Sequence, residues 1–496
     1  MSAYLHTASE VLAELHERGF FADCSALVSD SRQLRGSQDV FVAMPGARFD
    51  PRTIADSLIH DNKAGLVLVE YDEKRVYESA AVVPVLGLQA LLGQLAHAYY
   101  DKPSERLKII AVTGTNGKTT VTRWLAQSIL WMGGRAAVIG TLGYGEPDAL
   151  RKHSGLTTPD VLGMHNLLYT LDREGYEWVC LEASSIGLEQ GRLAGVHIHC
   201  AAFTNLTQDH LDYHQSMQAY ADAKMLLASW QGLGCAVSFV QDEHGLNFLS
   251  RATAVGAKVA SVGRSETDSV YLKSVKPMKA GLLLEFQEGD ESFRMSVPVI
   301  GAFNAENIAV VYGILRSIGF DTDAIVAALQ RVSPAPGRME LISESPCVVV
   351  DYAHTPDALS KVLTTLRELV DTRAGQLAVV FGCGGDRDKG KRPQMGRIAA
   401  ELADKVYVTS DNPRSESPVA IIEAVLEGVP EDCLNKVQVE EDRGRAIERS
   451  IHESADEDVV LLAGKGHEDQ QIIGGQVISF SDAQEARRAL DKRGER

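Results

Sequence analysis

Residues 112–120 read Val112-Thr113-Gly114-Thr115-Asn116-Gly117-Lys118-Thr119-Thr120, a glycine-rich stretch that decides the fold. The apolar run 107–111 precedes it, and apolar residues follow it with the spacing of one helix face, at Val121, Trp124, Leu125 and Ile129. This pattern predicts a strand, a glycine turn and a helix N-terminus. Glycines let the backbone approach an anion closely, and the free N–H groups of a helix start point at it.

Two side chains of this stretch suit a bound nucleoside triphosphate. Lys118 supplies a cation for the β- and γ-phosphates, and the Thr119 hydroxyl suits Mg²⁺. The match to the full phosphate-loop motif is partial, because its first glycine would fall at Val112. A glycine turn without a ligand is the alternative, and we favour the phosphate cradle.

Length and composition indicate a globular enzyme of about three domains. The chain has 496 residues, of which 45% are hydrophobic and 23% charged. Its net charge of −18, with no long Lys/Arg run, argues against nucleic acid as a main partner. An anionic substrate would therefore be held by local cationic pockets.

The cysteines and the N-terminus indicate a cytoplasmic protein. The 7 cysteines are scattered and form no CxxC pair, so they predict neither a disulfide framework nor a zinc site. The N-terminus lacks a charged-then-apolar signal pattern, and no apolar stretch reaches about 18 residues. We therefore expect no membrane insertion.

The apolar runs divide the chain into three α/β units, which we place at residues 1–98, 99–336 and 337–496. Alternating strands within 270–299 predict an antiparallel appendix to the middle sheet. The other expected strands are 40–44, 65–69, 82–85, 136–139, 178–181, 197–203, 348–350, 377–381, 406–409 and 459–463.

Polar clusters follow six of the expected strands. They begin at Glu182, Thr204, Asp351, Gly382, Asp411 and Gly464. Ligands of open α/β sheets bind beyond the carboxyl ends of strands. The clusters therefore predict a site between the second and third units, facing the phosphate loop.

A series of different short motifs extends along nearly the whole chain. They are SDSR (29–32), GTNGKTT (114–120), TTPD (157–160), EASS (182–185), FTNLTQDHLDYH (203–214), AYADAK (219–224), GAFNAEN (301–307), GRME (337–340), DYAHTPDAL (351–359), GCGGDRDKGKRP (382–393), DNPR (411–414) and AGKGHED (463–469). This series resembles the Mur ligase family. One departure is Ile186, which stands where the family has the histidine of a Ser-Ser-His motif.

The resemblance implies a three-domain architecture with a central ATPase domain, built on a parallel sheet with a phosphate loop, and a Rossmann-like C-terminal domain. It implies a ligase that uses ATP to activate the D-glutamate γ-carboxylate of UDP-N-acetylmuramoyl-L-alanyl-D-glutamate as an acyl phosphate. The amine of meso-diaminopimelate then attacks, in peptidoglycan precursor synthesis. The partners are therefore these small molecules, and we expect a monomer.

The resemblance also assigns site residues. Catalysis would rest on Lys118, Lys224, His210 and Glu182, and magnesium on Thr119, Glu182, His210 and Lys224. The ATP site would comprise Gly114, Thr115, Asn116, Gly117, Lys118, Thr119, Thr120, Asn304, Asn307, Arg338, Asp351 and His354. The uridine-nucleotide substrate would contact Ser29, Ser31, Arg32, Thr157, Thr158, Ser184, Gln190 and Arg192. Diaminopimelate would contact Arg387, Asp411, Asn412, Pro413, Arg414, Gly464 and Glu468.

Lys224 has two interpretations. A lone lysine on a helix is usually solvated, whereas the family pattern makes this one N-carboxylated by CO₂, so that its carbamate helps to hold a second Mg²⁺. The modification requires an amine that is often neutral, and burial lowers a lysine pKa readily.

Arg414 favours diaminopimelate over lysine, because its guanidinium can hold the distal carboxylate through two hydrogen bonds. Asp411 and Glu468 could then accept the distal ammonium. The alternatives are a lysine-adding Mur ligase, a nucleotide-gated binding protein and a folate polyglutamylating ligase. Lys224, His210 and Glu182 together disfavour the nucleotide-gated protein, because a switch needs no second metal. The motifs DNPR (411–414) and SDSR (29–32) argue against the folate polyglutamylating ligase.

Overall fold

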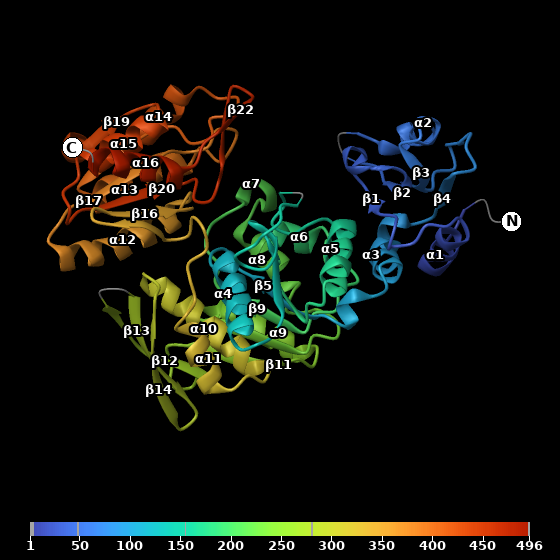
Figure 1. Cartoon of the computed structure of the whole chain (residues 1–496), viewed down its shortest axis with the longest axis horizontal. Helices are drawn as coiled ribbons and strands as arrows, with labels where there is room; N and C mark the ends of the chain where they lie inside the picture. The colour runs from blue at the N-terminus through green and yellow to red at the C-terminus, as the bar shows by residue number, and fades with distance from the viewer. Residues whose placement is uncertain (1–3, 47–48, 154, 279–280, 495–496) are drawn as a thin grey trace.

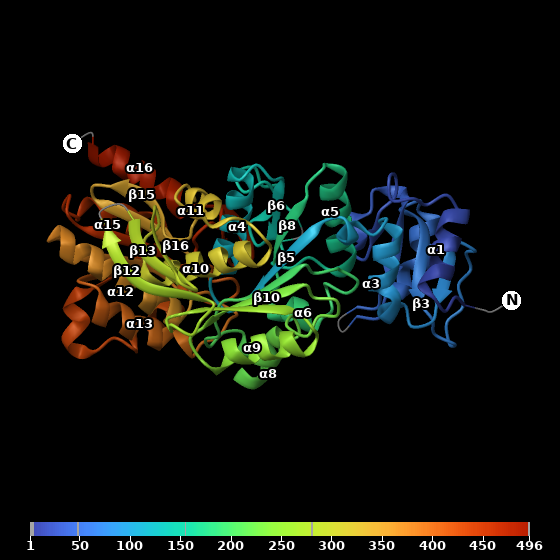
Figure 2. The ribbon, with the colours of Figure 1, turned by 90° about the horizontal axis from the view of Figure 1, so that it is seen from below.

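The computed structural model describes residues 4–46, 49–153, 155–278 and 281–494. Its strands form three main sheets and one small hairpin. The three sheets follow one another along the chain, and the first forms one end of the molecule in both views (Figures 1 and 2). The mixed α/β class is confirmed, while the exact unit boundaries stay a prediction.

The first sheet is fully parallel. Its order is β1 (Leu27–Val28), β2 (Gly36–Ala43), β3 (Ala64–Glu70) and β4 (Val82–Val85). The helical segments around it are α1 (Ala8–Glu17), η1 (Ser31–Gln33), η2 (Pro51–Ile54), α2 (Ala55–His60) and α3 (Leu88–Tyr99).

The middle sheet has ten strands in the order β14-β13-β12-β11-β10-β9-β5-β8-β6-β7. Their bounds are β5 (Lys108–Thr113), β6 (Ala136–Gly140), β7 (Gly143–Gly145), β8 (Trp178–Glu182), β9 (Cys200–Phe203), β10 (Cys235–Val240), β11 (Lys258–Gly263), β12 (Val270–Met278), β13 (Gly281–Glu288) and β14 (Glu291–Val297). The expected antiparallel appendix is confirmed, since β13 pairs antiparallel with both β12 and β14.

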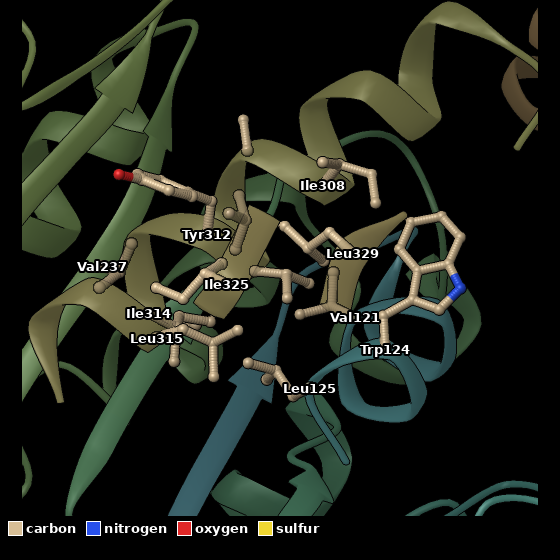
Figure 3. Close-up of a cluster of buried hydrophobic side chains, with 14 of the residues drawn as sticks. Val121, Trp124, Leu125, Val237, Ile308, Tyr312, Ile314, Leu315, Ile325 and Leu329 are labelled. Carbon is tan, nitrogen blue, oxygen red and sulfur yellow. The ribbon is translucent and has the colours of Figure 1, made fainter. Parts of the chain in front are cut away.

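The middle sheet carries its helices on two faces, and each face has an apolar core. The helical segments are η3 (Pro103–Glu105), α4 (Lys118–Trp131), α5 (Val161–Arg173), α6 (Ser185–Glu189), α7 (Leu211–His214), α8 (Met217–Met225), α9 (Glu243–Ala254), α10 (Ala302–Ser317) and α11 (Thr322–Leu329). Figure 3 shows Val121, Trp124 and Leu125 of α4 beside the apolar side chains of α10 and α11. This packing fixes the helix that begins at Lys118.

The third sheet is parallel except for its first strand. Its order is β15 (Glu340–Glu344), β16 (Cys347–Asp351), β20 (Val459–Ala463), β17 (Leu377–Phe381), β18 (Lys405–Val408) and β19 (Val437–Val439). A hairpin of β21 (Gln470–Ile473) and β22 (Gln476–Ser479) follows. The helical segments are α12 (Pro356–Arg373), α13 (Lys391–Leu402), α14 (Pro418–Leu426), η4 (Glu431–Lys436), α15 (Arg443–His452) and α16 (Asp482–Gly494). None of the helices in the described ranges is both long and apolar enough to cross a membrane.

A buried ion pair joins the start of α15 to the start of α16. The Nε and Nη2 atoms of Arg443 each donate to a different oxygen of Asp482 at 2.7 Å. Both side chains are 0% exposed. Arg443 also donates to the carbonyls of Ser410 and Ala463, at 3.4 and 2.9 Å, which directly precede the loops beginning at Asp411 and Gly464.

We expect Asp482→Ala to destabilise the third unit strongly, because it leaves the Arg443 charge buried without a counter-ion. Breaking such a pair typically costs about 3–5 kcal/mol. Hydrogen exchange of the third unit measures the loss directly. The matched control is Lys492→Ala on the same helix, whose exposed pair with Glu448 contributes less than about 1 kcal/mol. Equal exchange in the two variants would contradict the prediction.

Candidate active site

The loop between β5 and α4 has a backbone that requires its glycines. Gly114 has a φ of 143°, and a Cβ there would lie 1.9 Å from the hydroxyl of Thr204. Gly117 has a φ of 90°, and a Cβ there would lie 2.5 Å from Oδ1 of Asn307. Larger residues would therefore push the loop away from the elements that hold it.

The segment after β9 holds this loop from the other side. Asn205 accepts the N–H of Thr115 on its backbone carbonyl at 2.8 Å and the N–H of Asn116 on Oδ1 at 3.0 Å. The Thr204 hydroxyl donates to the carbonyl of Asn116 at 2.6 Å. The polar cluster that the sequence placed after strand 197–203 thus supports the phosphate loop directly.

Two lysines converge on one carbonyl of the loop. Lys118 Nζ donates to the carbonyls of Gly114 and Thr115, both at 2.9 Å, and Lys224 Nζ donates to that of Gly114 at 2.7 Å. Lys224 is only 1% exposed, and its ammonium position lies 4.3 Å from the centre of the Tyr220 ring. The solvated-lysine interpretation of Lys224 is therefore wrong.

The surroundings favour a neutral amine on Lys224. Burial, and then the charge of Lys118, hold the pKa of Lys224 well below its ordinary value. Desolvation also lowers the pKa of Lys118, while Glu182 and Asp209 oppose that shift. A bound phosphate would add negative charge and would favour the cationic form of Lys118.

A buried carboxylate lies beside the start of α4. Glu182, at the end of β8, accepts the hydroxyl of Thr119 at 2.9 Å and the N–H and hydroxyl of Thr141 at 2.9 and 3.2 Å. A Cβ on Gly140 would lie 2.1 Å from Glu182 Oε1, so a glycine there leaves room for the carboxylate. Hydroxyl and carboxylate oxygens form the donor set that Mg²⁺ prefers. Thr141 was not predicted from the sequence, although it directly follows the expected strand 136–139 and Gly140.

His210 lies at the start of α7, in a left-handed conformation with φ of 53°. Its Nε2 is 3.5 Å from Asp209, and its ring centre is 6.1 Å from that of Tyr220, one turn before Lys224 on α8. The pKa of Asp209 is lowered by His210, His354 and Lys118 although burial opposes the shift. The structure thus places His210 beside Tyr220, on the helix that carries Lys224.

His214 lies next to the position where the sequence departs from the family. Its Nε2 is 2.9 Å from the Ser185 hydroxyl, and its Nδ1 is 3.2 Å from Glu189. A histidine side chain therefore contacts this serine from α7, while Ile186 follows the serine in the chain.

A pocket between the middle and third units adjoins the phosphate loop. It brings together predicted nucleotide contacts from both units, and Tyr352 and Lys361 also line it although the sequence analysis did not single them out. The predicted contacts that line the pocket are Asn116, Gly117, Thr120, Asn304, Asn307, Arg338, Asp351 and His354.

Asp351 and Arg338 organise the third-unit wall of this pocket. Asp351 accepts the N–H groups of Met339 and Ala353, both at 2.8 Å. The Arg338 guanidinium lies 4.3 Å from the centre of the Tyr352 ring, and its buried Nε has no hydrogen bond within the described residues. Burial raises the pKa of Asp351, which Arg338 opposes.

One hydrogen bond at the pocket joins the middle unit to the third unit, and three others hold the segment that connects them. Asn116 of the phosphate loop donates to Asp357 of α12 at 3.3 Å. Trp124 Nε1 donates to the carbonyl of Ser333 at 2.9 Å, and Gln127 exchanges two hydrogen bonds with Ser333 at 2.8 and 3.1 Å. The helix that starts at the phosphate loop therefore also holds the connection to the third unit.

Five of the predicted uridine-nucleotide contacts form one network in the middle unit. Thr158 bonds Ser184 and the carbonyl of Glu182, while Arg192 donates to the Thr158 carbonyl at 2.7 Å and to Gln190 at 2.7 and 3.0 Å. Thr157 joins it through Thr141 at 3.1 Å.

The other three, Ser29, Ser31 and Arg32, lie in the first unit, directly after β1 (Figure 1). The side chain of Arg32 is 88% exposed and pairs with Asp30 at 2.7 Å. The structure therefore does not bring these three residues next to the phosphate loop.

The predicted diaminopimelate contacts gather where β17, β18 and β20 end. Arg414 has a φ of 53°, and its Nη1 donates to the carbonyls of Gly385 and Asn412 at 2.9 and 3.3 Å. A Cβ on Gly384 would lie 3.0 Å from Arg414 Nη1 and 3.6 Å from Arg387 Cγ, so both arginines lie close to this glycine.

A lysine that the sequence analysis missed fills the acidic part of this cluster. Lys465 is 0% exposed, and its Nζ lies 3.2 Å from Asn412 Oδ1, 3.1 Å from Glu468 and 3.7 Å from Asp411. Lys465 therefore already supplies one cation to Asp411 and Glu468, and their contact with a substrate ammonium stays a prediction. Lys465 lies within the AGKGHED motif, which was the available signal.

Comparisons with known proteins agree with this geometry. The profile of the Mur ligase middle domain matches residues 112–315, and that of the Mur ligase glutamate ligase domain matches residues 337–466. A UDP-N-acetylmuramoyl-L-alanyl-D-glutamate–2,6-diaminopimelate ligase of Pseudomonas aeruginosa is 42% identical over 474 residues, or 94% of each chain. The protein of the same name from Acidovorax sp. strain JS42 is 40% identical over 478 residues, covering 94% of this chain and 95% of its own.

Solved structures show the same fold over nearly the full length. A structure of a ligase with that name is similar with a TM-score of 0.67 and 35% identity, covering 95% of each chain. The MurF ligase of Thermotoga maritima in complex with ADP has a TM-score of 0.66 at 19% identity, which shows the fold alone. The profiles and the near-complete coverage at about 40% identity show that this chain belongs to the Mur ligase family.

Proposed function

We propose that this chain is the ATP-dependent ligase that adds meso-diaminopimelate to UDP-N-acetylmuramoyl-L-alanyl-D-glutamate, in the cytoplasm. The observation that carries the proposal is the identity of about 40% to ligases of that name over 94% of the chain. The pocket between the phosphate loop and the third unit supports it, because both ATP and an incoming amino acid must reach one place.

The reaction needs the D-glutamate γ-carboxylate to attack the γ-phosphorus of ATP, which releases ADP and gives an acyl phosphate. The free amine of diaminopimelate then attacks the acyl carbon, and phosphate leaves. Transfer between anions depends on positioning and on charge neutralisation. In this role Lys118, held by two loop carbonyls, would face the transferring phosphoryl group.

The donor set beside the loop fits magnesium. Thr119 and Glu182 offer oxygen ligands at the start of α4, and the hydroxyl of Thr141 lies within the same cluster. A bound Mg²⁺ would neutralise phosphate charge there. Thr141 would orient the Glu182 carboxylate, since its N–H and hydroxyl each donate to one carboxylate oxygen.

Lys224 fits the chemistry of N-carboxylation. Its amine is buried beside another lysine, so the neutral form that attacks CO₂ is favoured. The neutral nitrogen bonds to the carbon of CO₂ and releases one proton to solvent, which converts a neutral position next to Lys118 into an anionic one. A carbamate oxygen would then serve a second Mg²⁺, with His210 on the neighbouring α7.

The substrate would span two units. The network of Thr157, Thr158, Ser184, Gln190 and Arg192 would hold the muramoyl-dipeptide near the loop. The first unit, through Ser29, Ser31 and Arg32, would hold the uridine nucleotide. Arg387, Arg414 and the loops at Asp411 and Gly464 would hold diaminopimelate.

We expect Lys118→Ala to lower turnover by about 10²–10³, because it removes a fixed cation from the transferring phosphate. The measurement is phosphate release with ATP, the nucleotide substrate and diaminopimelate. Lys108→Ala, on the exposed start of β5, is the matched control and should retain normal rates. Near-normal phosphate release by Lys118→Ala would refute the assignment of the loop.

We expect Lys224→Ala to be inactive and to regain part of its activity with added acetate, whose carboxylate can fill the vacated ligand position. Lys224→Arg should stay inactive, since a guanidinium does not form the carbamate. A ¹³CO₂-labelled carbamate signal should be present in the unaltered protein and absent from Lys224→Arg. Normal activity of Lys224→Ala with Mg²⁺ would exclude the carbamate.

The decisive test of the proposed function compares kcat/KM for meso-diaminopimelate and for lysine. Lysine lacks the distal carboxylate and leaves Arg414 unpaired, and a polar site without its partner can discriminate by about 10⁴. We expect Arg414→Ala to remove most of this preference, whereas Arg397→Ala on the exposed side of α13 should leave it intact. Equal values for the two amino acids, or indifference to Arg414→Ala, would overturn the assignment.

A further inference from the structure

Three ligand-bearing side chains meet at the joint between the first and middle units, away from the phosphate loop. His97 belongs to the last turn of α3, Glu105 to η3 in the connection, and His197 to the segment before β9. Their nearest ligand atoms all lie within 4.8 Å of one another. The proposed ligase reaction uses none of these three residues.

His97 is the unusual member of this cluster. It is 9% exposed, and neither of its ring nitrogens has a hydrogen-bond partner among the described residues. A buried imidazole normally satisfies both nitrogens, because an unpaired polar atom loses its water without compensation. Its Nε2 instead lies 3.6 Å from Glu105 Oε1, beyond hydrogen-bond distance.

The backbone of the connection after α3 holds the three side chains close together. Asp101 and Lys102 both have positive φ, 56° and 50°, so the connection turns sharply after α3 and returns Glu105 beside His97. The N–H of His197 donates to Ser104 Oγ at 3.0 Å, which fixes the third segment to the same turn. The His97 and His197 rings are stacked with centres 5.4 Å apart.

The first and middle units pack closely against each other beside this cluster. A Cβ on Gly93, one turn before His97, would lie 2.6 Å from the Cβ of Ala194, so α3 touches the middle unit directly. A further histidine, His165 of α5, has its ring centre 5.5 Å from that of His97 and a buried Nδ1 without a hydrogen bond in the described chain.

We propose that His97, His197 and Glu105 form a Zn²⁺ site that clamps the first unit to the middle unit. Two imidazoles and a carboxylate are a common zinc donor set, with water in the fourth position. Ligands bonded at about 2.1 Å to a tetrahedral ion lie about 3.4 Å apart. The 3.6 Å between His97 and Glu105 is close to this value, and the exposed side chains of Glu105 and His197 can move to complete the geometry.

One existing contact competes with the metal. Lys102 Nζ lies 3.5 Å from the same oxygen of Glu105, and both side chains are about half exposed. An exposed ion pair of this kind contributes little. A divalent ion bonded to two imidazoles would displace the lysine, which can turn into solvent.

The test is a Zn²⁺ titration of the full chain against a chromogenic chelator, in excess Mg²⁺. The unaltered protein should bind one more Zn²⁺ ion per chain tightly than His197→Gln does. This variant loses only an exposed side chain, so we expect its fold to stay intact. We expect the affinity to fall at least about 100-fold in His197→Gln and in His97→Gln. Two variants should keep the full number of equivalents: His199→Gln, which alters an exposed histidine two residues away, and Glu182→Gln, which alters the magnesium cluster.

Hydrogen exchange tests the same site without counting the bound Zn²⁺ ions. Zn²⁺ should slow exchange at residues 97–105 and 195–198 in the unaltered protein and leave it unchanged in His197→Gln. Equal Zn²⁺ binding by His197→Gln and the unaltered protein would overturn the proposal. Loss of the equivalent in Glu182→Gln instead would also overturn it, because the ion would then belong to the nucleotide site.

Discussion

The carbonyl oxygen of Gly114 accepts hydrogen bonds from two lysines that are far apart in sequence, Lys118 and Lys224. Two ammonium groups on one carbonyl oxygen, of which that of Lys224 is buried, repel each other, so a neutral amine on one lysine or a bound anion stabilises the pair. The loop, the cluster around Glu182 and the pocket beside Asn116 surround this point. The repulsion between the two lysines therefore favours negative charge, from a phosphate or from a carbamate, next to the Gly114 carbonyl.

The third unit contains buried charges of its own, on Lys465, Arg443 and Asp482. Lys465 ties together the loops at Asp411 and Glu468, while Arg443 holds the preceding carbonyls and is neutralised by Asp482. The predicted amino-acid site is therefore supported by internal cations rather than built from free acidic groups. Arg414 and Arg387, which both lie close to Gly384, are the cations that the proposed function assigns to the substrate carboxylate.

The parts of the fold and site that are encoded locally could be predicted from the sequence. The strand, turn and helix around Lys118 depend on consecutive residues, and most sheet strands were found as apolar runs. The strands that were not predicted are β1, β7, β10, β11, β15, β19, β21 and β22, although β10, Cys235–Val240, is itself an apolar run. The burial of Lys224 and Lys465 arises from segments distant in sequence, so only the family resemblance singled out Lys224, and Lys465 was overlooked. The His97 cluster was missed for the same reason, because its three members come from three separate segments.

The hydrogen bonds from Trp124 and Gln127 to Ser333 have a mechanical consequence. They anchor the connecting segment to the helix that begins at the phosphate loop, so residues before Ser333 move with the middle unit. Any rotation of the third unit must then occur over the few residues that follow, 334–337, of which two are prolines. Pro334 and Pro336 have fixed φ angles, so only a few backbone dihedral angles of this connection are free to turn in such a rotation.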